Sequence, residues 1–121
     1  MNLYINKSEK INFDIIEEQK KVIESIKELE DEFDYLIFTD YEGSKNQRFS
    51  MALSDNEKDD TVPFYIDDSI NHIVIKFTFE QMNDILNYAY SLEQEGKIKR
   101  AYTIDYIKKN NDVYEFFVSV E

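Results

Sequence analysis

Residues 72–96 decide the fold, and they read HIVIKFTFEQMNDILNYAYSLEQEG. In His72–Phe79 an aliphatic or aromatic residue stands at every second position, and this period of two predicts a β-strand. Thr78 with Gln81 three residues later has the pattern of a capping box, which predicts that a helix begins at once. The buried stripe of this helix is expected to consist of Met82, Ile85, Leu86, Ala89 and Leu92. Gly96 is well placed to end it.

The N-terminal part of the chain also predicts strand followed by helix. Leu3–Phe13 is expected to form one or two short strands around a turn at residues 6–9. Asp14 with Glu17 resembles a capping box, so a helix is expected from about Asp14 to about Phe33. Its apolar stripe at helical spacing consists of Ile15, Ile16, Val22, Ile23, Ile26, Leu29 and Phe33.

The remaining strands are expected at Tyr35–Tyr41, Arg48–Leu53, Val62–Ile66, Ile98–Ile107 and Val113–Val120. Turn signals at residues 42–46 and 109–112 join two pairs of them as hairpins. Pro63 predicts that the strand Val62–Ile66 lies at an edge of the sheet, because proline has no N–H group to donate to a neighbouring strand. The order is then β-α-β-β-(β)-β-α-β-β, with the short edge strand in brackets. This order predicts an α+β fold: a mostly antiparallel sheet of about five to six strands, with two amphipathic helices packed on one face.

Length and composition are those of one domain, residues 1–121. Of the 121 residues 42% are hydrophobic, which is enough for a packed core despite a charged fraction of 33%. With no cysteine in the chain, disulfides and thiolate zinc sites are ruled out. No apolar run of membrane-spanning length occurs, and the N-terminus does not resemble a secretory signal. We therefore expect a cytoplasmic protein that makes no contact with a membrane.

Familiar catalytic patterns are missing from the sequence. The single histidine, His72, falls on the polar face of its predicted strand and is interpreted as an exposed strand residue. The adjacent pairs Asp59-Asp60 and Asp67-Asp68 do not match a calcium-binding loop. Phosphate-binding loops, dinucleotide fingerprints and nucleophile elbows do not occur either. We expect no enzyme, no cofactor and no metal site.

The charge of the chain is its most informative global property. The net charge is −12, and residues 1–68 hold 18 acidic and 8 basic residues, whereas residues 69–121 hold 8 and 6. Such a balance opposes direct binding to nucleic acid, whose phosphates attract basic surfaces. The last hairpin is locally basic, with Lys97, Lys99, Arg100, Lys108 and Lys109. This basic segment either offsets the negative charge of the first half of the chain or binds a small anion. Its simplest interpretation is a solvent-exposed sheet face and loop.

Acidic residues crowd the expected C-terminal turn of the first helix, where the helix dipole favours cations. These are Glu28, Glu30, Asp31, Glu32 and Asp34. Further candidates for binding a partner are Asp55, Glu57, Asp59, Asp60, Asp67 and Asp68. Tyr41 and Tyr65 stand beside acidic residues and are the candidate aromatic anchors, because tyrosine is enriched in interface hot spots.

These features favour a small acidic inhibitor that blocks a basic nuclease or another nucleic-acid-binding protein. A toxin immunity protein and a phage anti-defence protein, such as an anti-CRISPR that imitates nucleic acid, fit equally well. The alternative is a structural or adaptor domain, homodimeric through a strand edge, whose acidic surface serves solubility only. A third hypothesis is an enzyme of an unfamiliar class that uses surface carboxylates and a metal.

Overall fold

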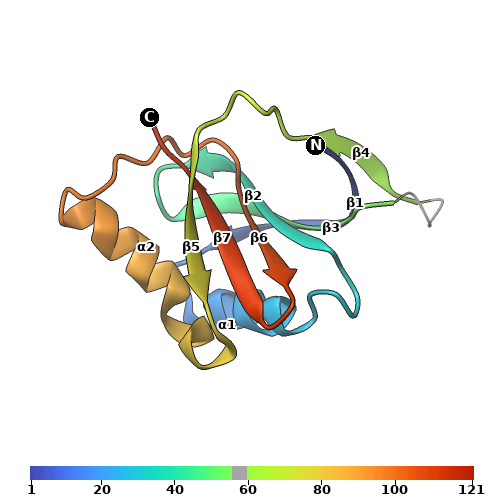
Figure 1. Cartoon of the computed structure of the whole chain (residues 1–121), viewed down its shortest axis with the longest axis horizontal. Coiled ribbons are helices and arrows are strands. Elements are labelled where there is room, and N and C mark those ends of the chain that lie inside the picture. Colours follow the sequence, from blue (N-terminus) through green and yellow to red (C-terminus); the bar gives the residue numbers. More distant parts are fainter. Residues whose placement is uncertain (56–59) are drawn as a thin grey trace.

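The computed structural model describes residues 1–55 and 60–121, and these fold into one antiparallel sheet with two α-helices (Figure 1). The seven strands lie in the order β4-β1-β3-β2-β6-β7-β5. Their bounds are β1 Asn2–Asn12, β2 Tyr35–Glu42, β3 Asn46–Leu53, β4 Val62–Tyr65, β5 His72–Phe77, β6 Asp105–Asn110 and β7 Val113–Ser119. The helices are α1 Ile16–Lys27 and α2 Ile85–Gln94, the latter preceded by a 3-10 turn, η1 Phe79–Asp84. The α+β class and the element order are confirmed, and the strand count exceeds the expected five to six.

Both helices pack on the same face of the sheet. Val22 and Ile26 of α1 lie in one buried cluster with Ile85 and Ala89 of α2. Phe38 of β2 lies at the centre of this cluster, with its ring centroid 5.2–5.9 Å from those of Phe13, Phe49 and Phe116. The larger core is therefore a layer between two amphipathic helices and one sheet face, as the apolar stripes predict.

A smaller core covers the opposite face of the β1–β3 half of the sheet. It joins Leu3, Ile37, Ala52 and Ile66. In Figure 1 the strands β5, β7 and β6 run steeply across the direction of β1 and β3, so the sheet is strongly twisted. Because both faces of β3 are covered, Ser50 is buried along with Phe49.

The second helical segment begins after Thr78 and ends before Gly96 as predicted, but Phe79–Asp84 form the 3-10 turn η1 and α2 itself begins only at Ile85. The Thr78 and Gln81 capping box is formed, with the Thr78 amide donating to Gln81 Oε1 at 2.9 Å. At the other end Gly96 takes a φ of 73°. The Lys97 amide then donates to the Leu92 carbonyl at 2.9 Å, which completes a Schellman motif.

The first helix is shorter at both ends than predicted. The expected capping box of Asp14 and Glu17 is replaced by Glu18, whose carboxylate accepts the Asn12 amide at 3.2 Å. The helix ends at Lys27, and residues 28–34 form a turn in which Glu30 has a φ of 71° and donates its amide to the Phe33 carbonyl. The apolar spacing is right about the burial of Leu29 and Phe33, although they are buried from within the turn rather than from a helix. It is wrong for Ile15 and Ile16, which are 45% and 62% exposed at the start of α1.

Two other predicted boundaries are also corrected. The strand β1 is continuous and carries a register shift between Ile5 and Lys7 in place of the expected turn. The strand expected from Ile98 begins only at Asp105, since Tyr102 has a φ of 53° and breaks the extended run. No helix among the described residues is long and apolar enough to cross a membrane.

Candidate functional site

An acidic hollow lies where the turn after α1 meets the end of β3. Its volume is about 360 Å³ and it is lined by residues 30–34 and 53–55. Its carboxylates are those of Glu30, Asp31, Glu32, Asp34 and Asp55. The sequence places these acids in two separate segments, and the pairing of Tyr35 in β2 with Ala52 in β3 brings the segments together.

One of the five carboxylates holds the rim of the acidic hollow in place. Asp34 Oδ2 accepts the Ser54 amide at 2.7 Å and the Ser54 hydroxyl at 2.8 Å. The Asp34 amide in turn donates to the Ala52 carbonyl at 2.9 Å. Asp34 therefore fixes the geometry of the acidic hollow, and the other four carboxylates are exposed to solvent.

The acidic hollow concentrates negative charge that the described chain does not neutralise. Of the ion pairs formed between residues of 1–55 and 60–121, none includes a carboxylate of the hollow. Lys7 approaches from β1, but its Nζ lies over the Phe33 ring, 5.8 Å from the centroid. Within the described residues no group of three or more acidic or histidine side chains is arranged to hold a metal ion.

Of the other predicted partner-binding residues, those that the structure describes do not line the acidic hollow. Glu28 is the exposed C-cap of α1, so the helix-dipole argument does not apply to the acids that follow it. Asp60 is exposed outside the lining of the hollow, and Glu57 and Asp59 lie outside the described residues. Tyr65 is exposed at the end of β4.

A second acidic patch follows β4. Asp67 and Asp68 line a separate depression of about 350 Å³ beside His72 and Phe117. Hydrogen bonds from Ser69 lower the pKa of Asp67. This patch is not part of the acidic hollow.

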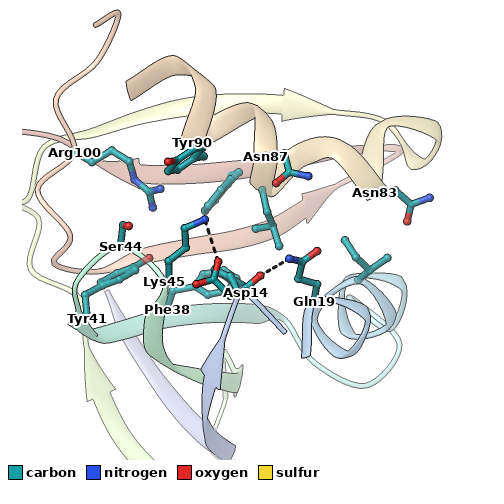
Figure 2. Close-up of a pocket in the computed structure, with 14 residues that line it drawn as sticks. Asp14, Gln19, Phe38, Tyr41, Ser44, Lys45, Asn83, Asn87, Tyr90 and Arg100 are labelled. Carbon is teal, nitrogen blue, oxygen red and sulfur yellow. Dashed lines mark hydrogen bonds and ion pairs between the residues drawn. The ribbon is translucent and has the colours of Figure 1, made fainter. Parts of the chain in front are cut away.

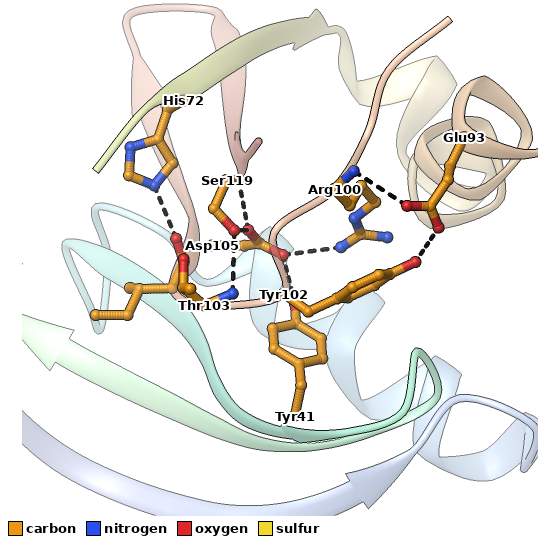
Figure 3. A network of polar contacts seen from close by, with 9 residues as sticks. Tyr41, His72, Glu93, Arg100, Tyr102, Thr103, Asp105 and Ser119 are labelled. Carbon is orange, nitrogen blue, oxygen red and sulfur yellow. Dashed lines mark hydrogen bonds and ion pairs between the residues drawn. The ribbon is translucent and has the colours of Figure 1, made fainter. Parts of the chain in front are cut away.

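Tyr41 does not present its side chain as an interface anchor. Its hydroxyl donates to Asp105 Oδ2 at 2.5 Å, and its ring meets the Tyr102 ring edge-on at 5.4 Å (Figure 3). Burial, and then the negative charge of Asp105, raise the pKa of Tyr41 well above its usual value. Tyr41 therefore points inward from β2 toward Asp105, and not outward from a hairpin tip.

The partner of Tyr41 is a fully buried carboxylate that the sequence analysis missed. Asp105, at the start of β6, has no exposed surface. Its Oδ1 accepts the amide and hydroxyl of Ser119 at 2.6 and 2.8 Å, and its Oδ2 accepts Nη2 of Arg100 at 2.8 Å. An acid within a predicted strand between Ile104 and Tyr106 was the available signal, since a charge there must be paired.

Arg100 and Tyr102 extend this network to α2. The Arg100 amide donates to Glu93 at 3.0 Å, and the Tyr102 hydroxyl donates to the same carboxylate. The Arg100 guanidinium lies 4.7 Å from the Tyr102 ring centroid, in cation–π contact. Burial and the bond to Glu93 raise the pKa of Tyr102 to about 12.

The single histidine has a hydrogen-bond partner. His72 Nε2 lies 2.7 Å from the carbonyl oxygen of Ile104, so His72 is a partnered strand residue.

Comparison with known proteins adds no relative: no protein-family model matches the sequence, and no curated protein is detectably similar to it.

Proposed function

We propose that this protein is a non-catalytic inhibitor that binds a basic surface of a nuclease or another nucleic-acid-binding protein through its acidic hollow. The observation that carries the proposal is the set of five carboxylates that share one depression without an ion pair among the described residues. Lysine and arginine side chains that normally bind phosphates are complementary to such a surface. The net charge of −12 steers a basic partner toward it.

The backbone of Glu30 adds support. A left-handed conformation is costly for a residue with a Cβ and is tolerated mainly by glycine. Glu30 nevertheless holds a φ of 71° while its side chain lines the acidic hollow. Backbone strain of this kind persists at functional sites.

Two biological settings require the same surface. An immunity protein neutralises a nuclease toxin of bacteria, and a phage anti-defence protein such as an anti-CRISPR occupies a nucleic-acid channel. In both settings the target offers a basic cleft to the carboxylates of the hollow. Salt-sensitive binding to the target would distinguish either setting from a purely structural role.

The test is a pull-down from lysate of the native host, eluted in rising salt, followed by affinity measurements on the partner. The variant reverses Asp31, Glu32 and Asp55 to lysine and leaves Asp34 in place. A matched control reverses Glu17, Glu80 and Asp112, which are exposed outside the hollow. Both triples move the net charge from −12 to −6, because each reversal adds two charges.

The hollow variant should lose about a hundredfold or more in affinity, since three lost charge contacts of about 1 kcal/mol each exceed two decades. The control should retain affinity within about threefold, a difference of roughly 0.6 kcal/mol. Added DNA or RNA should compete with the domain for its partner. Equal affinity of the two triples would contradict a role for the hollow, and recovery of no partner would favour the second candidate.

The second candidate is a homodimeric adaptor domain, and the free edge of β5 favours it. The Val120 amide donates to the Asn71 carbonyl at 2.9 Å, in the register that pairs His72 with Ser119. Antiparallel pairs alternate, so the backbone groups of His72, Val74 and Lys76 point away from the sheet. A groove of about 630 Å³ runs between this edge and α2.

Exposed apolar side chains line this groove, with Val74 44% and Tyr88 51% exposed. An edge strand with such neighbours is a template for pairing with a second copy. Light scattering after size exclusion should then give twice the chain mass of 14.5 kDa. Val74→Lys should restore the single-chain mass, whereas Val113→Lys, outside the groove, should not. A single-chain mass for the unaltered protein at all concentrations would exclude this candidate.

A further inference from the structure

A cavity of about 170 Å³ lies between α1, α2 and the sheet (Figure 2). Ile23, Phe38, Leu86 and Phe116 form its apolar wall. An engineered apolar cavity of about 150 Å³ is known to bind benzene, so this volume suits a single aromatic ring. The cavity is on the helical side of the sheet and is separate from the acidic hollow.

Arg100 lines one end of this cavity and carries a buried donor that lacks an acceptor. Its side chain is only 9% exposed, and Figure 2 shows the guanidinium reaching toward the space between Tyr41 and Tyr90. Nη2 is bound to Asp105, but Nε is buried and has no hydrogen-bond partner among the described residues. A buried charged donor without an acceptor is destabilising, and such groups are rare in native proteins.

Further donors line the same cavity. Lys45 places Nζ 4.5 Å from the centroid of the Tyr90 ring and 3.4 Å from Asp14. The Lys45–Asp14 pair is partly exposed, so it can open when a better acceptor arrives. The amide of Asn87 also lines the cavity from α2. Arg100 and Lys45 therefore line a space whose other walls are aromatic and aliphatic.

We propose that this cavity binds a small carboxylate that carries a single aromatic ring. The carboxylate accepts Nε–H of Arg100 and the ammonium of Lys45, and the ring packs against Phe38, Leu86 and Phe116. Charge-assisted bonds to a planar guanidinium favour a carboxylate over a neutral acceptor. The net charge of −12 repels anions at long range, but screening over about 8 Å at physiological ionic strength confines that repulsion. This inference does not depend on the acidic hollow.

Nuclear magnetic resonance tests the proposal directly, because the Nε–H group of a buried arginine gives its own signal. The probe is phenylacetate, and phenylacetamide serves as the uncharged control of the same shape. We expect the Arg100 Nε–H and Asn87 amide signals to move in a saturable way with millimolar phenylacetate. Phenylacetamide should bind at least tenfold more weakly. An Arg100 signal that does not move, or that moves equally with both probes, would overturn the proposal.

Variants locate the binding without removing Arg100, whose loss would leave Asp105 unpaired. Leu86→Trp fills the cavity and should abolish the shifts. Leu92→Trp, on the same helix but outside the cavity lining, should preserve them. Lys45→Gln should weaken binding at least threefold while the amide spectrum stays that of the folded protein. Saturable shifts that persist in a folded Leu86→Trp variant would place the ligand elsewhere and refute the assignment.

Discussion

The sharpest prediction concerns the buried carboxylate of Asp105, and the substitution is Asp105→Asn. Both oxygens of this side chain accept hydrogen bonds: Oδ1 from Ser119, and Oδ2 from Arg100 and Tyr41. An asparagine amide has the same shape but presents two donors on one side. Whichever way it is oriented, its NH₂ group faces donors, and Arg100 loses its ion-pair partner in the same step.

The size of the effect follows from the burial of the pair. Asp105 is fully buried and the Arg100 side chain is nearly so. Removing one partner of a buried ion pair costs about 3–5 kcal/mol, because the remaining charge stays uncompensated. Domains of this size are stable by about 5–15 kcal/mol, so Asp105→Asn should remove a large part of the total. The loss should be smaller in Asp105→Leu combined with Arg100→Met, which removes both charges together.

Urea unfolding followed by circular dichroism measures this loss. With a slope of about 1–3 kcal/mol per molar urea, the midpoint should fall by at least about 1 M. Asp112→Asn makes the same chemical change at the exposed tip of the β6–β7 hairpin and should shift stability by less than about 0.5 kcal/mol. A cost below about 1 kcal/mol for Asp105→Asn would refute the view that this network holds β2, β6 and β7 together.

Three other predictions concern local features. The raised pKa of Tyr102, about 12, means that its contribution to stability is complete below pH 10. Above pH 10 the unfolded chain loses this proton first, so stability should fall toward pH 12, and less so in Tyr102→Phe; urea unfolding at pH 9 and 11.5 measures the difference. Glu30→Gly should stabilise the protein by about 0.5–1 kcal/mol in the same assay by relieving the left-handed backbone, and Glu32→Gly should not. Gln81→Ala should cost about 0.5–1 kcal/mol by removing the acceptor of the Thr78 amide, with no effect expected from Gln94→Ala at the far end of α2.

The parts of the fold that were predicted correctly are determined by residues only a few positions apart in the sequence. The capping box before α2, Gly96 after it and Pro63 at an edge each act within a few residues. The same holds for the hairpin turn between β2 and β3. Conformation at these points is fixed by local hydrogen bonds and by backbone sterics, which the residue type alone specifies.

The parts that failed depend on contacts between distant segments. Helical spacing continues through Leu29 and Phe33, but α1 ends at Lys27, and after the turn the Asp34 amide binds the carbonyl of Ala52 in β3. In the sequence, Tyr41 has the pattern of a hairpin-tip residue. Its inward orientation depends on β6, which pairs with β2 and brings Asp105 within hydrogen-bond distance of the Tyr41 hydroxyl. Strand order is not encoded in local pattern, so the inner network between β2 and β6 was not predictable. The two acidic segments, in contrast, lie at the open end of the predicted β2–β3 hairpin, where Tyr35 pairs with Ala52.

The ion pairs formed by lysine and arginine determine which carboxylates remain unpaired. Of the six cations in residues 69–121, four form ion pairs: Lys97 with Glu95, Lys99 with Glu121, Arg100 with Asp105 and Lys108 with Glu115. The carboxylates of the acidic hollow form no such pair among the described residues. The acidic hollow therefore gathers five of the chain's 26 carboxylates into one group beyond the end of α1. A basic partner would be steered to that end, and the binding rate should fall steeply with salt for the unaltered protein but only weakly for the hollow variant.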